Sequence, residues 1–182
     1  QYKGEGANGR IVHFQAGPDF DAVVGDASHA YGDRLTRFRR YVAYLKPDVF
    51  LVLDDLEAPD PATFDWLAHS YGEITIAGRD VHIRKPKAGL LMRALWPTDA
   101  SWHLERTPPD SNGERLFKHL ALRPAEKARS VPFLVALFVS PLDGAGVPVE
   151  VEENGERMLV SVQRGEETVA LEFDLAQRTV ER

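Results

Sequence analysis

Apolar and polar residues alternate over short stretches along most of this chain. In residues 35–45 (LTRFRRYVAYL), one face of the pattern carries leucine, tyrosine and alanine with Arg37 and Arg39, and the other carries phenylalanine, valine and tyrosine with Arg40. A period of two is that of a β-strand, whose successive side chains point to opposite faces. Because neither face is purely polar, we expect this strand inside a crowded sheet and not at a solvated edge.

The same reasoning predicts strands along the rest of the chain. The predicted strands cover residues 23–24, 35–45, 49–56, 63–69, 74–76, 81–84, 90–96, 102–105, 116–122, 131–139, 149–152, 158–163 and 169–174. Turn-forming residues separate them, and Asn154-Gly155 is the clearest turn because both residues tolerate a positive φ. About a dozen strands with hardly any helical pattern predict an all-β fold, a large antiparallel β-sandwich of the supersandwich kind. Only residues 124–130 could form a short helical turn, and the polar segments 107–114 and 141–148 are predicted loops.

Size and composition are those of a single globular domain, so we expect one β-sandwich over residues 1–182. The chain contains no cysteine, which excludes disulfides and thiolate metal sites. It begins at Gln1 without a methionine, and we expect a C-terminal fragment of a longer protein. A net charge of −6 argues against nucleic acid or an anionic membrane surface as the main partner, although a local basic cluster can still bind an acidic substrate. No apolar run approaches the roughly 20 residues of a membrane span.

Several kinds of catalytic site find no support in the sequence. No G-x-S-x-G nucleophile motif and no complete phosphate-binding glycine loop occurs. Asp54 and Asp55 are neighbours in a predicted strand, so their carboxylates point to opposite faces and cannot form the acid pair of a glycosidase.

Histidine is the most useful residue type to follow. His69 ends a predicted strand and precedes the turn Ser70-Tyr71-Gly72, where a sandwich exposes side chains to a cleft. A zinc site could form from His69, His82 (or Asp80) and His103, which lie on successive predicted strands. The chain has no H-x-H or H-E-x-x-H spacing in support of such a site.

Arginines and aromatic residues offer two further readings. Arg37, Arg39 and Arg40 could bind a carboxylate or sulfate, but we favour a buried ion pair of one of them with Asp26, Asp54 or Asp55, because alternating faces prevent all three from reaching one ligand. Trp66 and the other tryptophans could stack on sugar rings, and a place in the core or in a cleft wall is the favoured alternative.

Taken in order, these segments resemble the β-sandwich part of heparinase II/III-like polysaccharide lyases. The resemblance rests on Gly25-Asp26-Ala27-Ser28-x-Ala30-Tyr31, Phe38-Arg39-Arg40, Leu45-Lys46-Pro47-Asp48-x-Phe50-x-Val52-x-Asp54, Trp66-Leu67-x-His69-Ser70, Gly89-Leu90-Leu91 to Pro97, and Ala128-Arg129-Ser130-Val131-Pro132-Phe133-Leu134 to Leu137. These segments span roughly Gly9 to Leu142, most of the chain.

The resemblance implies one half of a bipartite enzyme that cleaves uronate-containing polysaccharide by β-elimination. The other half, an N-terminal α/α toroid, is expected to carry the catalytic tyrosine, so the isolated chain is expected to be inactive. His69 is the residue expected to contribute from the sandwich, with Arg39, Arg40, Tyr31 and Trp66 as candidate substrate contacts. Some relatives hold a structural zinc, for which His69, His82 and His103 are the candidate ligands.

The expected partners are an acidic polysaccharide and the missing toroid, with a homodimer also considered, and the expected location is bacterial, periplasmic or secreted. The alternative function is a non-catalytic carbohydrate-binding or structural scaffold module.

Overall fold

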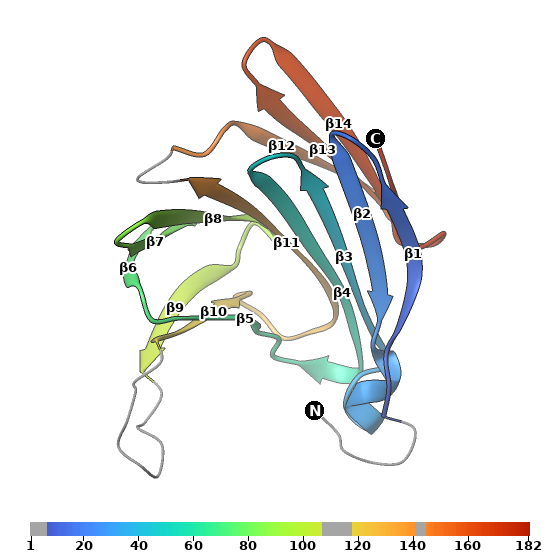
Figure 1. Cartoon of the computed structure of the whole chain (residues 1–182). Helices are drawn as coiled ribbons and strands as arrows, with labels where there is room; N and C mark the ends of the chain where they lie inside the picture. The colour runs from blue at the N-terminus through green and yellow to red at the C-terminus, as the bar shows by residue number, and fades with distance from the viewer. Residues whose placement is uncertain (1–6, 107–117, 141–144) are drawn as a thin grey trace.

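Three antiparallel sheets build the part of the chain that the computed structural model describes, residues 7–106, 118–140 and 145–182 (Figure 1). The central sheet has eight strands in the order β1 (Arg10–Ala16), β2 (Phe20–Asp26), β3 (Arg37–Leu45), β4 (Val49–Ala62), β11 (Ala128–Ser140), β8 (Ala88–Trp96), β7 (Asp80–Lys85) and β6 (Glu73–Ala77). The short sheet contains β5 (Trp66–Ser70), β10 (Lys118–Arg123) and β9 (Ser101–Arg106). The C-terminal sheet contains β12 (Val149–Asn154), β13 (Arg157–Arg164), β14 (Glu167–Asp174) and β15 (Thr179–Glu181). The predicted all-β sandwich is therefore confirmed.

Each face of the central sheet contributes to a separate hydrophobic core. Leu51 and Leu134 point into the first core, where they pack with residues of the C-terminal sheet such as Phe173. Val52 and Phe133, one position away on the same strands, point into the second core together with residues of the short sheet. The central sheet is thus the middle layer of three, and Figure 1 shows the short sheet on its concave side.

Each predicted strand overlaps an observed strand, although residues 35–36 and 63–65 lie outside β3 and β5, and residues 116–117 lie outside the described residues. Strand β3 lies inside the central sheet as expected. Asn154-Gly155 makes the predicted turn between β12 and β13, with Gly155 at φ 63°. The sequence did not indicate the edge strands β1 and β15 or the 3₁₀ segment η1 (Ser28–Arg34). The short helical turn considered for residues 124–130 does not form, because residues 124–127 connect β10 to β11 and residues 128–130 belong to β11.

Charged side chains tie β3 to β4 on both faces of the central sheet. Arg40 donates two hydrogen bonds of 2.6 Å to the carboxylate of Asp54. On the opposite face, Arg37 Nε lies 2.7 Å from an oxygen of Asp55, and Arg39 lies 3.9 Å from the same carboxylate and 3.7 Å from that of Asp26. The favoured ion-pair reading of these arginines is confirmed, and the two adjacent aspartates do face opposite ways.

Burial opposes ionisation of both aspartates. Asp54 and Asp55 are each only 3% exposed, and this desolvation raises the pKa of both carboxyl groups above the usual value, against the effect of their arginine partners. An ion pair in such a place contributes little net stability, but removing one partner leaves a buried charge without compensation.

We therefore predict that Arg40→Ala lowers the free energy of unfolding by about 2–4 kcal/mol, less than for a fully enclosed pair because the Arg40 side chain is 47% exposed. Urea unfolding at neutral pH measures the change. Without Arg40, the folded-state pKa of Asp54 lies further above the value of about 3.9 for an unfolded chain. The folded variant then binds this proton more tightly than the wild-type fold does, so its loss of stability relative to wild type is smallest in acid and grows as the pH rises through the folded-state pKa of Asp54.

Arg129→Ala is the matched control, because Arg129 pairs with Asp60 at 3.8 Å and both side chains are largely exposed. We expect this variant to change stability by no more than about 0.5 kcal/mol. Equal effects of the two substitutions would contradict a structural role for the Arg40–Asp54 pair.

Candidate functional site on the short sheet

The short sheet has one apolar face buried in the second core and a second face that carries both polar and apolar residues, including Leu67 and Ala121. Trp66 of β5, Leu120 of β10 and Trp102 of β9 point into the second core. Because successive side chains of a strand point to opposite faces, the residues next to Trp66, Leu120 and Trp102 on their own strands point away from the second core. We call this second surface the outer face, and His69 lies on it as an exposed residue.

Cross-strand pairing brings two imidazole rings together on the outer face. His69 of β5 lies directly opposite His119 of β10, and the ring centroids are 4.5 Å apart with an angle of 53° between the ring planes. Glu105 of β9 lies opposite His119 on its other side. The Nε2 atom of His119 is buried and has no hydrogen-bond partner. The row across the sheet therefore runs from an exposed imidazole to a half-buried imidazole to a carboxylate.

The neighbouring positions add a third imidazole and an occupied arginine. His103 of β9 is exposed, and its Nε2 lies 3.1 Å from Ser101 Oγ. Arg123 at the end of β10 donates hydrogen bonds of 2.6 and 2.7 Å to Asp65 and lies 3.6 Å from Glu105. Pairing with Asp65 raises the pKa of Arg123. Its guanidinium is thus engaged by protein carboxylates, whereas the imidazoles of His69 and His103 are exposed on this face.

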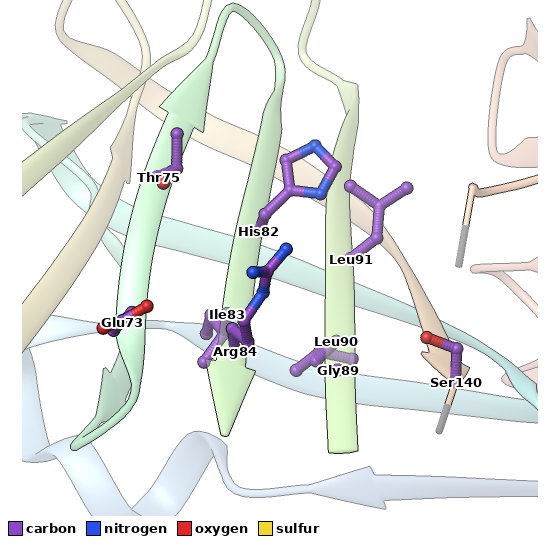
Figure 2. A pocket seen from close by; sticks show the side chains of 9 residues that line it. All are labelled: Glu73, Thr75, His82, Ile83, Arg84, Gly89, Leu90, Leu91 and Ser140. Atoms are coloured by element: carbon purple, nitrogen blue, oxygen red, sulfur yellow. The ribbon is translucent and has the colours of Figure 1, made fainter. Parts of the chain in front are cut away.

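The structure does not bring the three candidate zinc ligands together. His69 and His103 lie on β5 and β9, which are separated by β10, whereas His82 lies on β7 of the central sheet. Figure 2 shows His82 between Thr75 and Leu91 at a separate hollow of about 530 Å³. Within residues 7–106, 118–140 and 145–182, no group of three or more histidine, cysteine or acidic residues could hold a metal ion. The proposed ligand set of His69, His82 and His103 is therefore wrong.

The candidate substrate contacts are also dispersed. Trp66 is only 7% exposed and packs edge-on against Trp102 at 6.0 Å, so it is a core residue and its assignment to substrate is wrong. Arg39 and Arg40 point to opposite faces of the central sheet, and each is engaged by carboxylates. Tyr31 packs edge-on against Phe38, with ring centroids 5.0 Å apart, and partial burial raises the pKa of its hydroxyl.

Tyr31 and Arg40 nevertheless belong to one neighbourhood. The guanidinium of Arg40 lies 5.8 Å from the centre of the Phe38 ring, on the side of the central sheet that also faces the short sheet. Of the predicted substrate contacts, these two could reach a common ligand, whereas Arg39 lies on the other side.

Sequence reasoning did not select His119. It lies in a predicted strand, but its pairing with His69 depends on β5 and β10 becoming neighbours although about fifty residues separate them in sequence. A signal was present in the alternation His119, Ala121 and Arg123 against Leu120 and Leu122, which assigns His119 to the polar face of its strand. The predicted loop at 107–114 lies outside the described residues, as does part of the loop at 141–148.

Fold and site together define a three-layer β-sandwich with an imidazole-bearing outer face on its smallest sheet. Solved structures with this fold include heparinase III, the BT4657 gene product, with a TM-score of 0.73 and 11% sequence identity over 92% of this chain. The heparan sulfate lyase HepC from Pedobacter heparinus matches with a TM-score of 0.68 and 15% identity over 92% of this chain. The resemblance to heparinase-like proteins is thereby confirmed at the level of the fold. This chain spans only 28% of the length of each of these structures.

No family model matches the chain, and no curated protein matches it in sequence. Among the described residues, no helix is long and apolar enough to cross a membrane.

The outer face predicts a reactivity order for the histidines. Diethyl pyrocarbonate acylates an imidazole nitrogen that solvent and reagent can reach, so we expect His69 to be modified faster than His119, whose Nε2 is buried. Mass spectrometry of peptides after timed exposure measures both rates in one sample. The exposed His82 serves as an internal reference for a freely reachable ring. Modification of His119 as fast as that of His69 would contradict the arrangement of the two rings.

Proposed function

We propose that this chain is the β-sandwich part of a polysaccharide lyase, with His69 as its contribution to the active site. The observation that carries the proposal is the position of His69, exposed on the outer face of the short sheet in a fold shared with heparinase III over 92% of the chain. The proposed substrate is a uronate-containing polysaccharide, and the proposed reaction is β-elimination. The rest of the active site would come from a further part of a longer protein, because the chain spans 28% of the matched structures.

An exposed imidazole suits this chemistry. A uronate carries a carboxylate next to C5, and the C5 proton must leave before the bond between C4 and the glycosidic oxygen breaks. A cationic or hydrogen-bonding group beside the carboxylate stabilises the negative charge that develops as the proton leaves. A base then accepts the proton, and an acid returns one to the leaving oxygen. Imidazole can serve in either role near neutral pH, because its reference pKa is about 6.5.

Location and substrate follow from the same proposal. A polymer of uronates is too large to enter a cell freely, so we propose a periplasmic or secreted bacterial parent protein. The polymer is acidic, and the net charge of this chain is −6, so we propose that the rest of the parent protein supplies much of the electrostatic attraction.

A non-catalytic carbohydrate-binding module is the second candidate, and one observation favours it. Tyr44 and Phe50 stack with parallel rings 4.1 Å apart, and both are only partly buried. Partly exposed aromatic rings can stack on sugar faces. Calorimetric titration of this chain with uronate oligosaccharides tests that candidate directly, and binding that Tyr44→Ala abolishes would support it.

We predict that His69→Ala in the complete parent enzyme lowers kcat by about 10²-fold or more, the usual effect of removing a general acid or base. The assay follows the ultraviolet absorbance of the unsaturated uronate that β-elimination releases from alginate or a glycosaminoglycan. The matched control is His29→Ala, an exposed histidine on η1 outside the short sheet, for which we expect no change in rate. A folded His69→Ala enzyme with unchanged rate would exclude His69 from the reaction, and the absence of any unsaturated product from the unaltered parent would exclude the lyase function.

A further inference from the structure

The ring of His69 packs against the ring of His119. Among the described residues, no hydrogen bond to either ring nitrogen of His69 is found, and the ring packs against that of His119, 4.5 Å away between centroids. His69 lies near the end of β5, an edge strand of the short sheet. An exposed side chain in such a place samples several rotamers unless a neighbour restricts it.

His119 is the better anchored of the two rings. Its strand β10 is the middle strand of the short sheet and is paired on both sides. The next residue, Leu120, is fully buried in the second core, and His119 itself has its Nε2 atom buried. A side chain on the middle strand with a buried ring edge has fewer rotamers available than one on the edge strand.

We propose that His119 is a positioning residue for His69. Directly opposite residues of an antiparallel pair have Cβ atoms about 4.5–5.5 Å apart, which is close enough for one ring to limit the rotation of the other. The His119 ring restricts the range of orientations of the His69 ring, so that His69 presents its outward ring edge to a substrate in a fixed direction. This inference rests on the proposed function for its catalytic consequence, but the contact itself can be tested on this chain alone.

The first test measures the motion of the His69 ring in this chain by NMR of its side-chain carbon–proton pairs. We expect His119→Ala to shift the ring signals of His69 and to lower the order parameter of the His69 ring for picosecond–nanosecond motion. His119→Phe, which keeps a ring, should preserve most of that order parameter. His119→Asn provides a second ring-free variant if the alanine variant does not fold. His103→Ala is the matched control, because His103 lies on the same outer face without a ring contact to His69. An unchanged order parameter of the His69 ring in a folded variant without a ring at position 119 would overturn the proposal.

The second test uses the complete parent enzyme and separates kcat from KM. Small misplacements of a catalytic group reduce rates strongly, so we expect His119→Ala to lower kcat by roughly tenfold with KM nearly unchanged, and His119→Phe to retain most of the rate. In the double variant with His69→Ala, loss of His119 should have no additional effect, because the group that it positions is already absent.

The outcomes separate the two proposals. If His69→Ala has no effect on the rate, the proposed function fails, and the NMR experiment still decides whether the ring contact restricts His69. If His69→Ala lowers the rate and His119→Ala does not, the positioning role is overturned while the proposed function stands. An additional loss of rate from His119→Ala in the His69→Ala background would also overturn it, because His119 would then act independently of His69.

Discussion

Strands β4 and β11 must be buried on both faces, and this constraint organises the molecule. Along these two strands, consecutive residues such as Val52 and Leu53, or Phe133 and Leu134, are buried on opposite sides of the central sheet. A sheet with one solvated face could not accommodate them, because half of their side chains would face water. The C-terminal sheet therefore covers one face and the short sheet covers the other, which produces the three layers.

The site is a consequence of this layering. The short sheet needs one apolar face to complete the second core, and its other face has no core to join. Polar residues accumulate there at the alternate positions of each strand, including His69, His103 and His119. An imidazole on this face is held by the backbone of a packed sheet while its ring remains at the surface. Rigid elements of this kind position reactive side chains more accurately than loops do.

The sequence allowed the fold class, most strands and the facing of Asp54 and Asp55 to be predicted, because these depend on local alternation. It also indicated that His69 would be accessible. Local alternation does not reveal which strands become neighbours. The pairing of His69 with His119 and the separation of His82 from His69 could therefore not be predicted from the sequence. The favoured reading of Trp66 as a core residue is confirmed, and only its candidacy as a substrate contact was wrong, because the central sheet covers it.

The distribution of charge bears on what this chain can do by itself. The arginines considered as ligands for an acidic sugar are engaged by carboxylates. Arg40 is bound to Asp54, Arg39 lies between Asp26 and Asp55, and Arg123 is bound to Asp65. An arginine already paired with a carboxylate must give up that pair before it can bind a new anion, and this reduces the net gain. Of these three arginines only Arg123 lies on the outer face, so this face presents imidazoles more readily than a guanidinium that could bind an anion. Such a division would suit the proposed composite site, in which a further part of a longer protein would bind the polymer and the short sheet would provide the imidazole of His69.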